Sequence, residues 1–210
     1  MQQELAGAMA RLPLVAILRG VQPEEALAIG EVLVEAGFHL IEVPLNSPRP
    51  LESIATLARH LHTVALVGAG TVLSPEQAAQ VADAGGKLIV MPHGDTAVIR
   101  AAKRLGCACV PGIATPTEAF AALAAGADAL KLFPAEGSSP AALKAMRAVL
   151  PKDTAVLPVG GIAPDTMAPW RAAGAAGFGL GSALYKPGDS AAAVGEKARA
   201  FVTAWRALSA

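Results

Sequence analysis

The chain has 210 residues, of which 53% are hydrophobic and 16% are charged, and its 17 basic and 17 acidic side chains cancel. This composition excludes a disordered chain, and the lack of basic runs interleaved with aromatic residues argues against nucleic-acid binding. The first residues lack the basic and apolar regions of a secretory signal. Glycines punctuate the uncharged stretch 172–185, which favours a strand and turn there over a membrane helix. We expect one domain over residues 1–210, with no nucleic-acid or membrane partner.

Eight short apolar runs recur along the chain, and most are rich in Val, Leu and Ile without polar alternation. Such runs are typical of parallel strands that are covered on both faces. They span residues 14–18, 40–43, 65–67, 88–91, 108–110, 129–133, 155–159 and 177–180.

Helix signals fill the intervals between these runs. A hydroxyl residue followed by proline predicts an N-cap and a first helical position at Ser74-Pro75 and at Thr115-Pro116. Further starts are predicted near Pro23, Asp95, Ser139 and Pro164. Glycine closes five of the helical segments, as a left-handed C-cap requires, at Gly37, Gly85, Gly106, Gly126 and Gly174. Residues 2–11 predict a short extra helix, and residues 190–208 a C-terminal one.

The repeating strand-and-helix unit predicts the fold class. Eight units of about 20–27 residues fit an α/β protein that folds as a small (β/α)8 TIM barrel with an extra N-terminal helix. A doubly wound open sheet is the alternative, but no Gly-rich fingerprint follows the first strand. In a barrel the active site lies at the carboxyl ends of the strands, which directs attention to the residues there.

The run 129–133 carries Lys131 between two leucines. A lysine in a strand at a sheet edge would point into solvent, but a barrel strand has no edge. A buried ammonium either finds a partner or loses its proton, and a neutral lysine is a nucleophile. Glu42 sits in an equally apolar run, and Arg19 follows the first strand, so we expect the three to share the barrel mouth. A purely structural Lys131–Glu42 ion pair is the alternative.

Two glycine turns suggest an anion site after the last two strands. Gly160-Gly161 precedes Pro164, and Gly181-Ser182 precedes a short apolar segment that we expect to begin a helix. Backbone N–H groups in such turns approach anions closely, and these two loops form the usual phosphate site of the barrel. The alternative is that they are only tight turns.

A metal site is not expected. Of the four histidines, only His93 falls at the carboxyl end of a predicted strand, and no acidic cluster accompanies it. Cys107 and Cys109 lie two apart in one strand, where a disulfide is unfavourable. We expect both to be core residues of a protein in the reducing cytoplasm.

At this point the chain resembles the 2-keto-3-deoxy-6-phosphogluconate and -phosphogalactonate aldolases over nearly its whole length. The motifs that carry the resemblance are Ile17-Leu18-Arg19-Gly20, Glu42-Val43-Pro44-Leu45-Asn46-Ser47-Pro48, Gly68-Ala69-Gly70-Thr71-Val72-Leu73, Pro111-Gly112, Lys131-Leu132-Phe133-Pro134, Val159-Gly160-Gly161 and Gly179-Leu180-Gly181-Ser182.

The resemblance implies a homotrimeric class I aldolase that needs no cofactor. Lys131 would form the Schiff base, and Glu42 would be the general acid and base. The remaining implied substrate contacts are Arg19 and Thr71 for the carboxylate, Gly160, Gly161, Gly181 and Ser182 for the phosphate, and also Asn46, Pro92 and Phe133. The substrate would be a phosphorylated 2-keto-3-deoxy sugar acid, and the products pyruvate and D-glyceraldehyde 3-phosphate.

The sequence after the second strand bears on the substrate. Leu45-Asn46-Ser47-Pro48 is similar to the phosphogalactonate branch, whereas the phosphogluconate branch has arginine and threonine in place of Asn46 and Ser47. His93 stands where the phosphogalactonate branch has asparagine. The alternatives left open are a phosphogluconate or 4-hydroxy-2-oxoglutarate aldolase and a phosphate-binding barrel that forms no imine.

Overall fold

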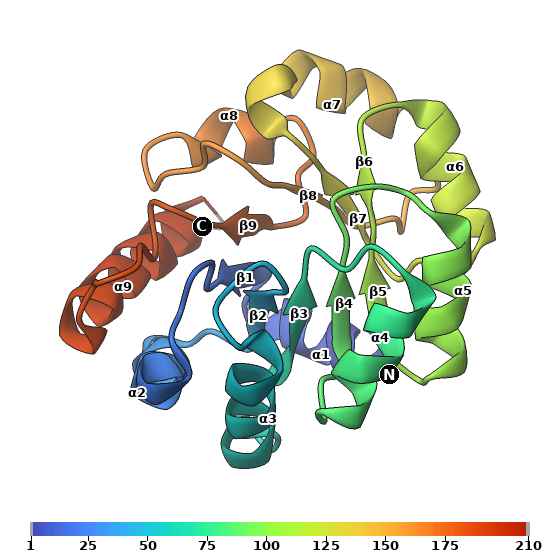
Figure 1. Ribbon diagram of the computed structural model, residues 1–210. Coiled ribbons are helices and arrows are strands. Elements are labelled where there is room, and N and C mark those ends of the chain that lie inside the picture. The colour runs from blue at the N-terminus through green and yellow to red at the C-terminus, as the bar shows by residue number, and fades with distance from the viewer. Residues whose placement is uncertain (1, 209–210) are drawn as a thin grey trace.

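The computed structural model describes residues 2–208 and has an α/β architecture, in which parallel strands form a curled sheet with helices around its outside (Figure 1). The strands are β1 (Leu14–Ile17), β2 (Leu40–Pro44), β3 (Leu66–Gly70), β4 (Leu88–Val90), β5 (Ala108–Val110), β6 (Gly112–Ile113), β7 (Leu130–Leu132), β8 (Val156–Pro158) and β9 (Phe178–Leu180). The helices are α1 (Gln2–Arg11), α2 (Pro23–Ala36), α3 (Pro50–Leu61), α4 (Pro75–Asp83), α5 (Thr96–Arg104), α6 (Pro116–Ala124), α7 (Pro140–Arg147), α8 (Met167–Ala172) and α9 (Ala191–Ala207), with a single 3-10 turn η1 (Ala135–Gly137) in residues 2–208. Each of the eight predicted runs overlaps a strand.

The strands pair in parallel and fall into two hydrogen-bonded groups, ordered β5-β4-β3-β2-β1-β9 and β6-β7-β8. Pro111 alone separates β5 from β6, and its carbonyl accepts a hydrogen bond from the Lys131 N–H at 2.8 Å. Proline has no N–H to donate to a neighbour. The strand predicted at 108–110 therefore ends before Pro111, and the chain continues after it as the separate strand β6. At the other junction, Val159 and Gly179 form a parallel bridge between the end of β8 and β9.

The predicted helix signals are largely confirmed. Ser74 and Thr115 accept hydrogen bonds from the N–H groups of Gln77 and Glu118, both at 3.3 Å. Asp95 caps α5 in the same way, with its Oδ1 2.7 Å from Ala97 N. The extra N-terminal helix is α1, and α9 lies within one residue of its predicted bounds. The five closing glycines all have positive φ, as expected: Gly37, Gly85, Gly106, Gly126 and Gly174.

Two predicted helix starts are wrong. The helix expected at Pro164 begins instead at Met167, because residues 164–166 form a turn in which Thr166 Oγ1 accepts from Ala163 N at 2.9 Å. The segment after Gly181 is a turn and not a helix, closed by the N–H groups of Leu184 and Tyr185 on the Gly181 carbonyl. Pro187 follows too soon for that turn to propagate as a helix.

The core has two parts. The larger part fills the space between the sheet and the surrounding helices, and the smaller lies inside the curled sheet. Leu5 and Ala8 of α1 are buried against the inner cluster, so that α1 covers the amino ends of the strands, behind the sheet in Figure 1. The opposite, carboxyl ends of the strands are left for the loops that carry the polar residues. Among residues 2–208, every helix is too short or too polar to span a bilayer.

Candidate active site

Glu42 on β2 and Lys131 on β7 lie inside the curled sheet, where the exposed fractions of the two residues are 1% and 5%. Both line a cavity of only about 10 Å³, the size of a single water. The apolar residues that line it with them come from five other strands, β1, β4, β5, β8 and β9, and from the residue that follows β8: Val15, Ile17, Val90, Val110, Leu157, Val159 and Gly179. The sequence prediction that the two charged residues converge in an apolar interior is therefore confirmed in its geometry.

The Glu42 carboxylate fits because β3 carries a glycine beside it. A Cβ atom at Gly70 would overlap Glu42 Oε2, so any larger residue there would displace the carboxylate. Oε2 is buried and has no hydrogen-bond partner among the described residues. Burial raises the pKa of Glu42 to about 7, while the charges of Lys131 and Arg19 act in the opposite direction. The group can thus change its protonation state near neutral pH.

The Lys131 side chain is desolvated in the same cavity. Burial lowers the pKa of its ammonium group, Arg19 lowers it further, and Glu42 raises it. Lys131 Nζ also lies 4.5 Å from the centre of the Phe133 ring, two residues along the chain. Phe133 is half-buried and forms part of the wall next to the amine. The net lowering of the pKa increases the fraction of neutral, nucleophilic amine.

The other predicted site residues lie where strands end. Arg19 follows β1 on an exposed turn, and its charge acts on both Glu42 and Lys131. Thr71 follows β3, is half-buried and has an unusual positive φ of 55°. After β2 and β4 come the exposed Asn46, the half-buried Pro92 and the exposed His93. Within residues 2–208, no three His, Cys, Asp or Glu side chains gather as metal ligands would.

Ser47 differs from its neighbour Asn46. Its side chain turns inward, is 8% exposed, and accepts a hydrogen bond from Gly20 N at 2.9 Å. The two residues that distinguish the branch in the sequence therefore have different surroundings: Asn46 faces solvent and Ser47 contacts the turn that carries Arg19.

The glycine turn after β8 is open to solvent at Gly161 and has positive φ at both Gly160 and Gly161. A Cβ atom at Gly160 would overlap the carboxylate of Glu136, which comes from η1, directly after Phe133-Pro134. Glu136 therefore contacts the predicted anion turn from η1, which follows the strand that carries Lys131. Gly181 is half-buried with open space at its Cα, and Ser182 is exposed.

Sequence reasoning missed two of these neighbours. The sequence presents Gly70 only as part of a motif and gives Glu136 no predicted role. An acidic residue five positions after a buried lysine hints at Glu136, because the loop that follows a strand lies at the carboxyl end of that strand. No local signal identifies Gly70 as the neighbour of Glu42, because the two residues meet only when β2 and β3 pair.

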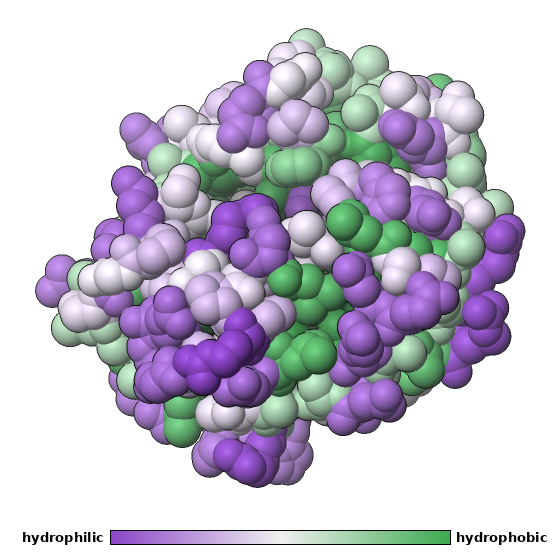
Figure 2. Space-filling view, viewed as in Figure 1, coloured by the Kyte–Doolittle hydropathy of each residue, from purple (hydrophilic) through white to green (hydrophobic). Residues whose placement is uncertain are grey.

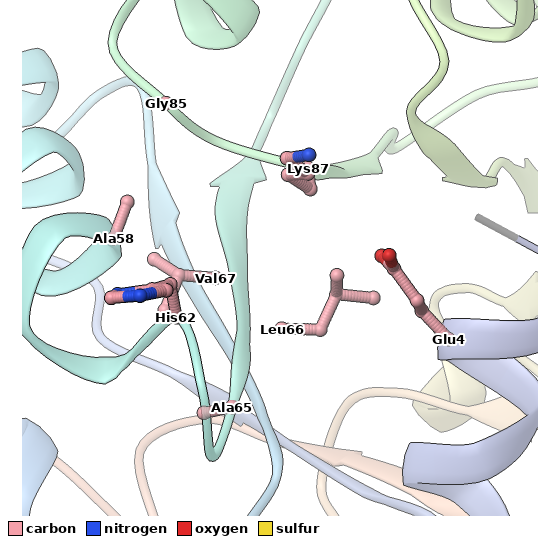
Figure 3. A pocket seen from close by; sticks show the side chains of 8 residues that line it. All are labelled: Glu4, Ala58, His62, Ala65, Leu66, Val67, Gly85 and Lys87. Atoms are coloured by element: carbon pink, nitrogen blue, oxygen red, sulfur yellow. The ribbon is translucent and has the colours of Figure 1, made fainter.

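A larger pocket that is also lined by charged side chains lies at the other end of the sheet (Figure 3). It has a volume of about 220 Å³ and is lined by Glu4 from α1, His62 after α3, and Lys87 before β4, with Leu66 at the start of β3. Ligands of parallel α/β sheets bind beyond the carboxyl ends of the strands. The candidate active site is accordingly the smaller, buried site at Glu42 and Lys131.

Comparison with known proteins decides the family. The family model described as KDPG and KHG aldolase matches residues 5–194. The chain belongs to the KDPG and KHG aldolase family. This aldolase, a carbon–carbon lyase, is 50% identical over 93% of its length to the 2-dehydro-3-deoxy-6-phosphogalactonate aldolase of Escherichia coli (strain K12), of which it covers 96%.

Solved structures agree with this family assignment. The aldolase superposes with a TM-score of 0.93 and 49% identity on the structure described as native KDPGal, covering 95% of its own chain and 97% of the other. It is also similar, at 26% identity and a TM-score of 0.79, to a KDPG aldolase from Legionella pneumophila in which pyruvate was captured as a covalent carbinolamine intermediate. That comparison covers 94% of this aldolase and 97% of the Legionella chain.

Proposed function

We propose that this protein is a Schiff-base aldolase that cleaves 2-dehydro-3-deoxy-6-phospho-D-galactonate to pyruvate and D-glyceraldehyde 3-phosphate. The observation that carries the proposal is the buried pair of Lys131 and Glu42, with pKa values displaced toward neutrality from opposite sides. The 50% identical relative supports the choice of substrate, and the covalent pyruvate carbinolamine in the Legionella aldolase supports the imine route.

The proposed fold of the catalytic domain, residues 1–210, is a closed (β/α)8 barrel. Counting β5 and β6 as one strand that passes through Pro111 gives eight strands. The bridge between Val159 and Gly179 supports closure between β8 and β9. In such a ring Lys131 has no route to solvent except the mouth at the carboxyl ends.

Lys131 begins the reaction as a neutral amine. At an ordinary pKa near 10.4, only about one lysine in 2,500 is neutral at pH 7. Because burial and Arg19 lower the pKa of Lys131, a larger fraction of the amine is neutral and able to react. The amine adds to the C2 carbonyl of the substrate to form a carbinolamine. Loss of water gives an iminium ion, which accepts the electron pair of the C3–C4 bond.

Glu42 moves the proton that accompanies bond cleavage. Its carboxylate takes the C4 hydroxyl proton, directly or through a water, as the C3–C4 bond breaks and the C4 oxygen becomes the aldehyde of glyceraldehyde 3-phosphate. The enamine of pyruvate remains on Lys131. Protonation at C3 and hydrolysis of the imine then release pyruvate and return the neutral amine.

The two anionic ends of the substrate have separate sites in this proposal. Arg19 and Thr71 hold the carboxylate, since a guanidinium binds carboxylates in a bidentate manner. Backbone N–H groups of the two glycine turns bind the phosphate. The phosphate residues are Gly160, Gly161, Gly181 and Ser182, and Asn46, Pro92 and Phe133 complete the walls around the sugar.

The assembly proposed for the aldolase is a homotrimer in the cytoplasm. Large apolar side chains that are exposed in the isolated chain support self-association, among them Leu73 at 48% and Phe120 at 46%. Figure 2 shows apolar side chains gathered in the middle of one face, surrounded by polar ones. The buried free thiols of Cys107 and Cys109 support a reducing compartment.

Turnover of the two C4-epimeric substrates tests the substrate assignment. We expect kcat/KM for the phosphogalactonate to exceed that for 2-dehydro-3-deoxy-6-phosphogluconate, because the residues after β2 match the phosphogalactonate branch. Equal values, or a preference for the phosphogluconate or for 4-hydroxy-2-oxoglutarate, would replace the proposed substrate while keeping the aldolase chemistry.

A further inference from the structure

Arg19 is held on both sides by hydrogen bonds to the segment that carries Glu42. The N–H of Leu18, before Arg19, donates to the Glu42 carbonyl at 2.9 Å. The N–H of Gly20, after Arg19, donates to the Ser47 hydroxyl at 2.9 Å. The backbone of Arg19 is therefore fixed relative to β2 at two points, and the second of them is a side chain.

Ser47 is itself rigidly placed. Its N–H donates to the Pro44 carbonyl at 2.9 Å in the turn that ends β2, and its side chain is buried. The N–H of Leu45 donates to the Gly70 carbonyl at 2.9 Å, which ties the same turn to β3. A continuous series of short contacts thus runs from the strand of Glu42 to the turn of Arg19.

The turn at Gly20 has little freedom to adopt another shape. Gly20 has a φ of 85°, a conformation that favours glycine, and the Val21 N–H closes the turn on the Leu18 carbonyl at 3.3 Å. From the other side Pro187 packs so closely that a Cβ atom at Gly20 would lie 2.7 Å from its Cγ. Ser47 and Pro187 hold the turn between them.

We propose that Ser47 is a positioning residue for Arg19, whose hydroxyl fixes the turn that directs the guanidinium toward the carboxylate of pyruvate and of the substrate. The inference rests on the proposed function, because it assigns Arg19 to the carboxylate. It gives Ser47 a role through the backbone and not through contact with the sugar. Of the two residues that distinguish the branch, only Asn46 is left to face the substrate directly.

Displacement of the Arg19 guanidinium would change the pKa values of Lys131 and Glu42. The charged groups that act on the Lys131 amine in the described part of the chain are Glu42 and Arg19, and Arg19 lowers the pKa of both. Moving the guanidinium away raises both pKa values. The pH at which pyruvate adduct formation becomes half-maximal therefore rises, an effect that a general loss of stability does not produce.

The test uses pyruvate and borohydride on the full-length chain. Ser47→Ala removes the hydroxyl, and Ser47→Thr keeps it. Ser53→Ala is the matched control, since Ser53 is also buried but its hydroxyl has no hydrogen-bond partner among the described residues. For each variant, the rate of adduct formation is measured against pyruvate concentration and against pH.

We expect Ser47→Ala to need on the order of tenfold more pyruvate for half-maximal trapping and to show a pH profile moved to higher pH. Ser47→Thr and Ser53→Ala should stay close to the parent protein. In an Arg19→Ala background, Ser47→Ala should add little further loss, because the two residues act as one unit. The pH profile decides the matter even where Ser47→Ala is less stable, because a general loss of stability does not move it.

Three results would overturn the inference: unchanged pyruvate dependence and pH profile in Ser47→Ala, an equal loss in Ser53→Ala, or fully additive losses with Arg19→Ala. Failure of the proposed function is distinguishable from these results, since the parent protein itself would then form no pyruvate adduct.

Discussion

At the scale of single residues, the site depends on two charged groups placed where water is excluded. Desolvation moves the pKa of Glu42 up to about 7 and the pKa of Lys131 down. Their mutual attraction opposes both shifts, so burial outweighs pairing. Where mutual attraction dominates instead, each charge stabilises the other and both pKa values move the opposite way.

Gly70 gives the first prediction. Replacing it with alanine places a methyl group where Glu42 Oε2 now lies, so the carboxylate must move. We expect Gly70→Ala to lower kcat on the order of 100-fold, since small misplacements of a catalytic group have effects of that size. Gly7→Ala in α1, where a Cβ atom meets nothing within 4 Å, is the control and should keep full activity. A folded Gly70→Ala variant with normal turnover would contradict the role of Glu42.

The second prediction concerns pH. In the proposed mechanism Glu42 accepts a proton during cleavage and must be ionised to do so. Because its pKa in the free protein is raised to about 7, kcat/KM should fall as the pH drops through 7, with Glu42 contributing about tenfold per unit below it. The measurement is kcat/KM between pH 5 and 9. The Glu42→Gln variant should bind substrate but turn over far more slowly, and its pH profile should lack the contribution of Glu42 to the decline at low pH. A flat pH profile in the parent protein would rule out Glu42 as the proton acceptor.

Sequence reasoning identifies residues of this kind when their chemistry conflicts with their neighbours in the chain. Lys131 and Glu42 stand out because each interrupts an apolar run, and the structure brings both into one cavity. Gly70, Ser47 and Glu136 could not be placed in this way. Their contacts with Glu42, Gly20 and Gly160 join separate loops and strands, and only the folded chain brings them together.

At the scale of elements, strand positions and helix caps were predictable because they depend on local chemistry. Apolar runs, hydroxyl-proline starts and closing glycines lie where expected. The errors occur where a local signal was incomplete. Pro164 begins a turn before α8, and the segment after Gly181 closes on itself before Pro187. The phosphate proposal therefore depends on the backbone of two turns and not on two helix N-termini.

The third prediction tests how helix α5 is joined to the sheet. The side chain of Asp128, before β7, is almost fully buried and accepts hydrogen bonds from Lys103 Nζ at 2.7 Å and from Cys109 N at 2.8 Å. Asp128→Ala leaves both donors without this partner, so we expect the free energy of unfolding in urea to fall by about 2 kcal/mol. Glu52→Ala removes an exposed ion pair with Arg49 and should change stability much less. Equal effects of the two substitutions would show that burial of Asp128 contributes nothing.

At the scale of the whole molecule, the two ends of the sheet differ: one is closed by packing and the other carries the candidate active site. Helix α1 covers the amino ends of the strands, and the polar residues gather at the carboxyl ends. The sequence predicted this division from the order of its elements, since each strand of a parallel sheet is followed by a loop at the same end. The homotrimer implied by the family resemblance stays a prediction, because the order of elements within one chain does not identify what covers exposed residues such as Phe120.

The measurement that tests the central claim most directly is reduction with borohydride in the presence of pyruvate, followed by peptide mass mapping. The account predicts one stable pyruvyl adduct, on Lys131, with none in a Lys131→Met variant of otherwise normal fold. The absence of an adduct in the parent protein, or an adduct on Lys144 or Lys186 in its place, would contradict it.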